Sequence, residues 1–419
     1  MNRFDDTPSS PRQRAIAFSI LLAGVVCMGM GQTIVFAVLP PLARDLGVGD
    51  FQVLAIFMLS ALFWVLMGPI WGRNSDIYGR RPFIVIGLTA FAVSTASFAT
   101  VLHLGLDGAL AGAALYALLL GTRSLYGVIG SATPGAAQAY IADRTPVERR
   151  TAGMSAFSAA FGIGAMVGPA FAGAVVALDP LAPLYAVAAA AACSVVAVWF
   201  FLPERTAPKE RTARPALSPL DRRIRAFLVY GLATAIATAI PIQFIAFYFI
   251  DRLGLGSKDA LQLVGVALSA AAMASLFSQL VLVQRFNLPP MTLMRAGPIL
   301  VAIGHAIIAA STMIGPLVFG MLLSGLGAGM LGPGFIGGAS LAVRNEEQGS
   351  AAGLSNAAGA SGFIFAPILG HYFYAIAPGA LFIATASIAA ACAVYAFVEK
   401  DLARPLPKPA APAEPDFPV

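Results

Sequence analysis

The chain has 419 residues, of which 58% are hydrophobic and only 11% are charged, and its mean hydropathy is +0.82. Soluble domains average roughly 45–50% apolar and about 25% charged residues, so this composition predicts an integral membrane protein. The formal net charge of +6 then belongs to short loops and tails, which excludes a soluble basic domain of the kind that binds nucleic acid.

Twelve long apolar segments follow one another along the chain. They lie near 15–40, 50–71, 82–102, 110–141, 151–177, 182–202, 225–250, 259–284, 291–311, 315–342, 350–374 and 378–398. Each is long enough to cross a bilayer as a helix, and none alternates in the way that barrel strands do. The sequence therefore predicts an all-α membrane protein with 12 transmembrane helices. The polar start, MNRFDDTPSSPRQR, lacks a cleavable signal pattern, so we expect the first helix to be retained.

The lysines and arginines gather on one side of these predicted helices. If both termini are cytoplasmic, 22 of the 26 lie in or directly beside the cytoplasmic loops and the two tails. Only Arg44, Arg252 and Lys258 fall on the opposite side, and Arg123 lies within a helix. Basic residues favour the cytoplasmic face, so we expect both termini to be there.

The chain divides near its middle into two halves of six helices. We expect a cytoplasmic tail at 1–14, a bundle at 15–202, a linker rich in proline and arginine at 203–224, a second bundle at 225–398 and a disordered tail at 399–419. Short stretches recur about 200 residues apart: TPG at 133–135 corresponds to GPG at 332–334, and GMS at 153–155 corresponds to GLS at 353–355. This order favours duplication of one six-helix unit.

Four motifs of the first half carry a family resemblance. They are GRNSDIYGRR at 72–81, RSLYGVIG at 123–130, YIADRTPVERR at 140–150 and GAMVGPAFAG at 164–173. Together with the two six-helix halves, they resemble the major facilitator superfamily, and in particular the 12-helix bacterial drug:proton antiporters of the tetracycline-exporter group. Two positions depart from the usual motifs: Ile77 replaces a basic residue, and Tyr126 replaces glutamine. The resemblance implies a multi-pass protein of the bacterial inner membrane.

The first of these motifs predicts a gating cluster. Gly72 and Gly79 would permit a tight turn and a close approach of helices, while Asp76 and Asp143 lie at helix ends with Arg80 between them. The resemblance implies that this aspartate–arginine–aspartate cluster latches the two halves in the outward-facing state. Arg81 is interpreted mainly as an anchor that fixes the topology.

The motif at 164–173 predicts a helix that bends and packs closely. Gly164, Gly168 and Gly173 would present a smooth face to a neighbouring helix, and Pro169 removes one backbone hydrogen bond. Glycine spacing alone is equally explained by ordinary helix packing. Its occurrence with the other three motifs favours a role in transport.

Arg123 is the most informative single residue, because it lies about 20 Å into its helix and so near the middle of the bilayer. A charge at that depth costs about 2.5–3.5 kcal/mol or more and is expected to face a cavity or a partner. Tyr126 shares its helical face, although a structural arginine bound to backbone carbonyls is an alternative.

None of the 20 acidic residues lies in the interior of a predicted helix, although a proton antiporter needs a group that gains and loses a proton. The first helix offers only Gln32 and Thr33 where related exporters carry an acid. Asp143 and His305 are the candidates for proton binding, and His305 is also explained as a packing residue. A cavity with Arg123, with His305 as a second candidate for the substrate site, and no carboxylate is expected to favour anionic or zwitterionic substrates.

The second half supplies weaker candidates for the substrate site. They are Gln243, Tyr248, Gln279 and Asn356, each of which is also explained by helix packing. We expect a secondary active transporter that exports a small amphipathic compound by alternating access and proton antiport. The alternative is an importer or facilitator of an organic anion such as a carboxylate metabolite or siderophore. No nucleotide, nucleophile or metal motif is present, so neither an enzyme nor a cofactor is expected. The predicted partners are the substrate, protons and the lipid bilayer, and the predicted state is a monomer.

Overall fold

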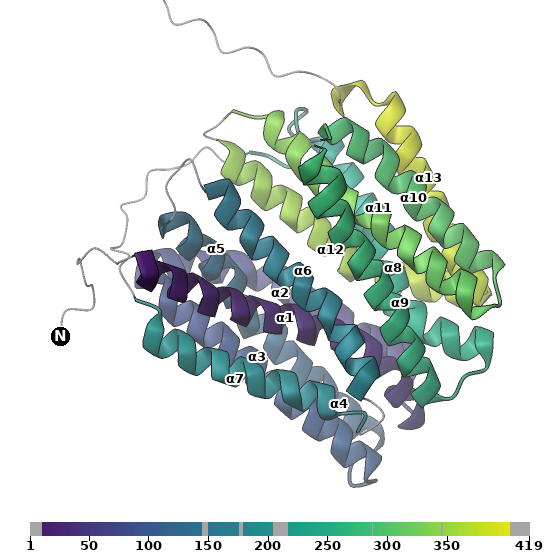
Figure 1. Cartoon of the computed structure of the whole chain (residues 1–419). Helices are drawn as coiled ribbons and strands as arrows, with labels where there is room; N and C mark the ends of the chain where they lie inside the picture. Colours follow the sequence, from purple (N-terminus) through teal and green to yellow (C-terminus); the bar gives the residue numbers. More distant parts are fainter. Residues whose placement is uncertain are drawn as a thin grey trace, which may run out of the picture.

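The computed structural model of the protein describes residues 11–144, 150–175, 179–203, 217–286, 288–344 and 347–402, and all of the secondary structure in these ranges is helical (Figure 1). The first half contains α1 (Pro11–Asp45), α2 (Asp50–Tyr78), α3 (Arg80–Leu106), α4 (Gly112–Leu125), η1 (Tyr126–Gly130), α5 (Ala132–Arg144), α6 (Arg150–Val175) and α7 (Ala182–Phe201). The second half contains α8 (Arg225–Leu253), α9 (Ser257–Phe277), η3 (Ser278–Arg285), α10 (Pro290–Ala310), α11 (Ile314–Leu341), α12 (Gln348–Ile376), α13 (Pro378–Val398) and η5 (Lys400–Leu402).

The prediction of an all-α membrane protein is confirmed. Within the described ranges, 11 helical spans are long and apolar enough to cross a membrane, counting α4, η1 and α5 together as one and α9 with η3 as another. Helix α6 is the twelfth by position, and its apolar part is Ala159–Val175. Figure 1 shows the helices of the first half, purple to teal, on one side and those of the second half, green to yellow, on the other.

The predicted end of the second helix is wrong. Helix α2 continues to Tyr78 instead of ending near residue 71, so most of the motif at 72–81 is helical. The helix stops only at Gly79, whose φ of 98° lies in the region that glycine adopts without strain. The span predicted at 110–141 is confirmed as one membrane span, Gly112–Ile141, and it contains η1, a π-helical turn. Polar residues do not stop a helix outside the membrane, and a π turn leaves no simple trace in composition.

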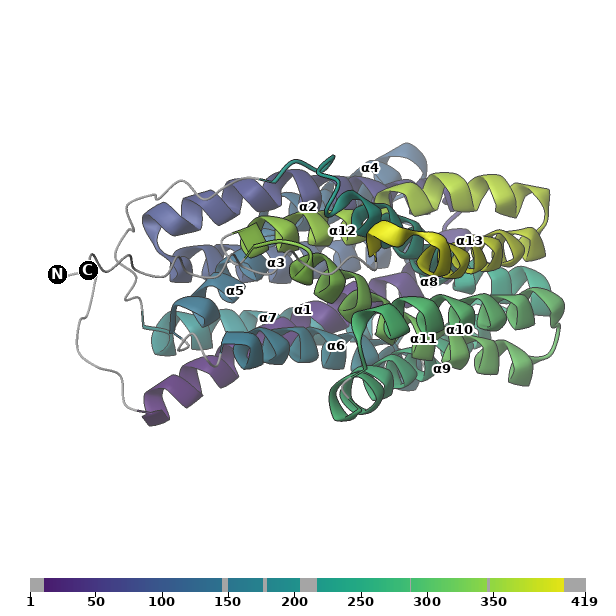
Figure 2. The same ribbon diagram turned by 90° about the horizontal axis from the view of Figure 1, so that it is seen from above.

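The two halves meet mainly along two lines of contact, α2 with α12 and α6 with α9, which Figure 2 shows on its upper and lower sides, and α1 also contacts α8 and α9. At the second line, a Cβ on Gly265 would come within 2.7 Å of the Pro169 carbonyl oxygen. Such a close approach is possible only between small residues, and in a membrane it supplies the packing that holds helices together. We name the two ends of the molecule by their turns: the Gly79 end between α2 and α3, and the Arg44 end between α1 and α2.

Candidate substrate cavity and gating elements

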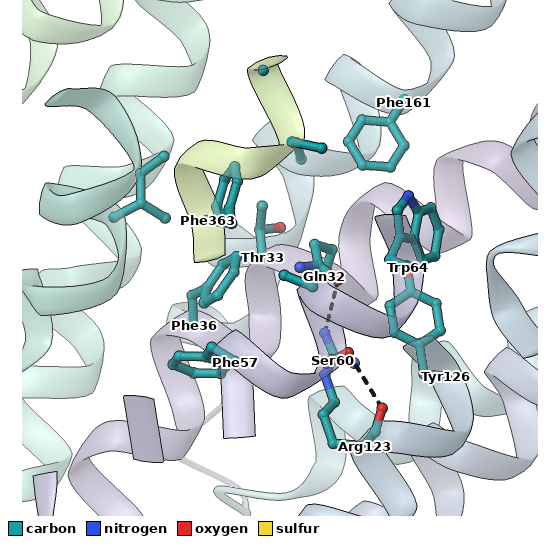
Figure 3. A pocket seen from close by; sticks show the side chains of 15 residues that line it. Gln32, Thr33, Phe36, Phe57, Ser60, Trp64, Arg123, Tyr126, Phe161 and Phe363 are labelled. Carbon is teal, nitrogen blue, oxygen red and sulfur yellow. Dashed lines mark hydrogen bonds between the residues drawn. The ribbon is translucent and has the colours of Figure 1, made fainter. Parts of the chain in front are cut away.

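A cavity of about 420 Å³ lies between the two halves (Figure 3). The first half contributes Gln32, Thr33, Phe36, Phe57, Ser60, Ala61, Trp64, Arg123, Tyr126, Phe161 and Ala165, and the second half contributes Ile242, Gly359, Ala360 and Phe363. Its volume is typical of sites for small molecules, which are concave and mostly apolar with a few polar groups.

Arg123 is the one charged side chain among the described lining residues, and only 2% of it is exposed. Its Nη2 donates a hydrogen bond of 2.7 Å to Oε1 of Gln32, and the guanidinium carbon lies 4.6 Å from the centre of the Tyr126 ring. The buried Nε has no hydrogen-bond partner among the described atoms. The arginine therefore has a neutral acceptor and an aromatic face as neighbours, and no carboxylate beside it in the described part of the lining.

Aromatic rings form most of the cavity wall. Figure 3 shows Phe36, Phe57 and Phe363 together on one side, with Trp64 and Tyr126 on the other. The Trp64 and Tyr126 ring centres are 5.1 Å apart, and Phe36 lies 4.7 Å from Phe57. Flat apolar walls on both sides of a single cation suit a compound with an apolar body and a polar group at one point.

The π turn η1 directly follows the helical turn that carries Arg123. The Trp71 indole donates to the Val128 carbonyl at 2.6 Å, and the Ser60 hydroxyl donates to the Arg123 carbonyl at 3.3 Å. Gly127 lets η1 approach α2, because a Cβ there would come within 2.4 Å of the Ser60 carbonyl oxygen. Side chains of α2 thus satisfy backbone groups near the π turn, a device that is frequent at functional sites.

The structure brings together three of the predicted substrate-site residues, Gln32, Arg123 and Tyr126. The other five lie outside the lining of this cavity. The Tyr248 hydroxyl donates to the Ile308 carbonyl at 2.9 Å, and Nε2 of His305 is 2.9 Å from the Ser324 hydroxyl, between α10 and α11. Gln243 is fully buried on α8, Gln279 on η3 bonds to Ser275, and Asn356 is exposed on α12.

Several lining residues were not predicted, although α2 carries a signal that would have found them. Phe57, Ser60, Ala61 and Trp64 are spaced at i, i+3, i+4 and i+7, which places them on one helical face. That face combines a hydroxyl, a small residue and two aromatic rings. Phe161 and Phe363 carry no such signal, because phenylalanine is common on every face of a membrane helix.

At the Gly79 end, Arg80 joins the three helices α2, α3 and α5. It forms an ion pair with Asp76, donates from Nε to Asp143 at 3.2 Å, and donates to the Ser75 hydroxyl at 2.8 Å. Arg81 donates to the Trp199 carbonyl of α7 and lies over its ring. The predicted cluster of Asp76, Arg80 and Asp143 is therefore assembled within the first half.

The prediction that both glycines of this motif allow close packing is wrong for Gly72. It lies inside α2, where an added Cβ would meet no described atom within 4 Å. Gly79, in contrast, forms the turn. The extension of α2 explains the difference, because it moves the turn seven residues further along the chain.

The motif of α6 packs on both sides. A Cβ on Gly164 would come within 2.1 Å of the Val26 carbonyl oxygen of α1, and one on Gly168 would come within 2.5 Å of the Thr33 hydroxyl. Gly173 faces α9 of the second half, at ordinary van der Waals distance from Gln262. Helix α6 thus lies directly against α1 within its own half and against α9 across the boundary.

The segment that precedes α8, residues 217–224, lies at the Gly79 end and is fixed there by ion pairs of Arg223. Arg223 donates to Asp221 at 2.8 Å and to Glu347 at 2.8 Å. Glu347 directly precedes α12. These hydrogen bonds hold the pKa of both carboxyl groups below their usual range and raise the pKa of the guanidinium. The three groups therefore remain charged at neutral pH.

Comparison with known proteins agrees with this architecture. The sequence matches the family model of the Major Facilitator Superfamily over residues 21–367. It is 29% identical over 361 residues to the class D tetracycline resistance protein of Salmonella ordonez, covering 80% of this chain and 84% of that protein. It is 26% identical over 363 residues to the class B protein of Escherichia coli, covering 82% and 86%.

Among solved structures, the chain is similar to an inward-facing, occupied bacterial homologue of the human lysosomal transporter Spinster. The TM-score is 0.69 at 14% identity, covering 93% of this chain and 97% of the other. The likeness confirms the fold, and the sequence match confirms the resemblance drawn from the four motifs. The structure has two helical halves around a shared cavity, the family model spans most of the sequence, and the relatives are transporters rather than enzymes. The chain therefore belongs to the Major Facilitator Superfamily.

Proposed function

We propose that this transporter exports a small amphipathic compound, anionic or zwitterionic, across the bacterial inner membrane by alternating access and proton antiport. The Gly79 end faces the cytoplasm in this proposal, because the loops at that end carry most of the basic residues. The similarity to tetracycline resistance proteins supports export rather than uptake.

The charge balance of the cavity is the observation that carries the proposal. Arg123 is buried, and no carboxylate lies among the described lining residues. At a separation of 4 Å and an effective dielectric constant of about 20, two unit charges interact by about 4 kcal/mol, so a cationic substrate would be repelled and an anion attracted.

The aromatic walls account for the amphipathic body of the substrate. Six aromatic side chains line the cavity: Phe36, Phe57, Trp64, Tyr126, Phe161 and Phe363. They offer apolar surface on both sides, and together with Arg123 they favour a compound that carries an acidic group on an apolar or aromatic frame.

Proton coupling in this proposal uses a group outside the cavity lining. His305 is fully buried against Ser324 and does not line the cavity, which favours its interpretation as a packing residue. Asp143 lies at the Gly79 end beside Arg80, where a change of its protonation would alter the gating cluster. We therefore favour Asp143 over His305 as a proton-binding group.

Transport by the purified protein in liposomes tests the proposal. A panel of labelled aromatic carboxylates and their neutral amides is presented under imposed gradients of pH and voltage. Movement of an acid against its own gradient, opposite to proton flow, is the expected result. Movement together with protons, or without regard to pH, would support the importer or facilitator instead and contradict antiport. Preference for the amides would contradict the assignment of anionic substrates.

A further inference from the structure

At the Arg44 end, a pair of charged side chains connects the two halves. Arg44 lies in the last turn of α1, and Asp251 lies in the last turn of α8. The arginine donates from Nη1 to Oδ1 of Asp251 at 2.5 Å and from Nη2 to Oδ2 at 2.9 Å. This bidentate geometry is the strongest arrangement of an arginine with a carboxylate. Its two members come from opposite halves, so it must break whenever the halves separate at this end.

Each charge of this pair also has a partner within its own half. Arg44 donates to Asp50 of α2, from Nε at 2.9 Å and from Nη2 at 2.6 Å. Asp251 accepts a hydrogen bond of 2.5 Å from the Tyr374 hydroxyl of α12. When the halves separate, Arg44 therefore keeps one carboxylate and Asp251 keeps one donor. Neither charge is left alone, and the contact across the boundary can break and re-form at low cost.

Two further contacts reinforce the same boundary. The Ser257 hydroxyl at the start of α9 donates to Asp45 at 2.6 Å, and the Arg44 guanidinium lies 5.0 Å from the centre of the Phe247 ring. Nearer the middle of the molecule, Phe36 of α1 stacks on Phe363 of α12 at 5.9 Å, and both rings line the cavity. An aromatic layer and an ionic layer thus stand in series between the cavity and this end.

We propose that Arg44 and Asp251 form the gate that closes the cavity at the Arg44 end. When this gate is open, Arg44 stays bonded to Asp50, and Asp251 stays bonded to Tyr374. This inference rests on alternating access as proposed above, and it assigns the outer gate to residues outside the four motifs. The cluster at the Gly79 end and this pair then lie at opposite ends of the cavity. Both are formed in this structure, but only the pair of Arg44 and Asp251 crosses the boundary between the halves.

Two isosteric variants of the same cluster provide a matched test. Asp251→Asn removes the charge across the boundary, whereas Asp50→Asn removes an equal charge from the same guanidinium within one half. The reporter is Ala61→Cys in the cavity wall, in a background without Cys27, Cys193 and Cys392. A membrane-impermeant maleimide is applied to the outside of intact cells, and the rate of labelling measures how often the cavity opens to that side.

Asp251→Asn is expected to increase this rate by about fivefold or more, since loss of a partly exposed ion pair shifts a two-state equilibrium by about that factor. Asp50→Asn is expected to leave the rate within about twofold of the parent, because Arg44 keeps its bond to Asp251. Equal effects of the two variants, or no effect of Asp251→Asn, would overturn the proposal.

A second experiment does not depend on the folding of these variants. Arg44→Cys and Asp251→Cys are combined and joined by a reducible bifunctional thiol reagent in the folded protein. Linking is expected to abolish outside labelling of Ala61→Cys, and reduction is expected to restore it. Labelling that continues in the linked protein would overturn the gate. The labelling assay needs no substrate, so a working gate without anion transport would contradict the proposed function alone.

Discussion

Replacement of Arg123 by glutamine removes the only described charge from the cavity while keeping a side chain of similar length that can still bond to Gln32. A hydrogen bond to a charged partner contributes about 1.5–3 kcal/mol, and about 1.4 kcal/mol corresponds to a tenfold change in Kd. Arg123→Gln should therefore weaken binding of an aromatic acid by about 10- to 150-fold. The neutral amide of the same acid should change by less than about threefold, because its contacts with the aromatic walls are unaffected.

Binding to the purified protein measures this difference. The ligand pair is the tightest-binding acid of the panel and its amide, and Kd is determined by scintillation proximity with the labelled compounds. Arg295→Gln is the matched control. Arg295 also lies on a membrane helix, donates to a backbone carbonyl at Ala396 and stacks on an aromatic ring, Phe397, but it does not line the cavity.

The control variant should leave both dissociation constants unchanged. If Arg123→Gln weakens the acid and the amide equally, the loss is structural and the charge does not select the substrate. If neither constant changes, Arg123 does not face the bound compound, and the assignment of the cavity is wrong.

Three further predictions concern packing, gating and the linker. Gly164→Ala should lower the melting temperature in detergent, since its Cβ would overlap the Val26 carbonyl and overpacking costs about 1–3 kcal/mol. The control, Gly121→Ala, has open space around it and should not lower the melting temperature. Equal melting temperatures of the two variants would contradict the packing of α6 on α1. Asp76→Asn should slow transport while Kd for the substrate stays within about twofold, and full transport would remove Asp76 from the gate. The carboxyl groups bound to Arg223 have lowered pKa values, so they stabilise the segment above their ordinary pKa, and this stabilisation is lost only as pH falls below about 4. Protection of residues 217–224 against hydrogen exchange should therefore be the same at pH 5 and pH 8. Arg223→Gln should reduce this protection at every pH in that range.

The sequence was sufficient for the architecture because a bilayer leaves few alternatives. A membrane helix needs an apolar run of about 20 residues, and such runs are visible without any knowledge of tertiary contacts. The position of Arg123 at the cavity followed from the same physics, since a charge in mid-membrane requires a polar or hollow environment. These inferences depend on solvation alone, which composition reports directly.

Contacts between helices from opposite halves could not be inferred in the same way. Arg44 and Asp251 are 207 positions apart, and each separately resembles an ordinary charge at a helix end. Phe161 and Phe363 look like lipid-facing residues until the two halves are placed together. Gln243 and His305 were expected at the cavity because they are polar, yet both are buried elsewhere. Polarity shows that a side chain needs a particular environment, and only packing shows which one.

Helix α1 contacts all three layers of the pathway: Gln32 bonds to Arg123, Phe36 stacks on Phe363, and Arg44 binds Asp251. Gln32 and Arg44 are separated along the helix by about 18 Å at a rise of about 1.5 Å per residue, so a rigid helix would make every gate movement a movement of the substrate site. Pro40 and Pro41 lie between the aromatic and ionic layers and lack the N–H groups that a helix would use there. The least hydrogen-bonded turn of α1 therefore separates the gate from the cavity. A bend at that turn would let the Arg44 end open while the Arg123–Gln32 contact keeps its geometry, as the proposed gate requires if the substrate is to be held until the exit is open.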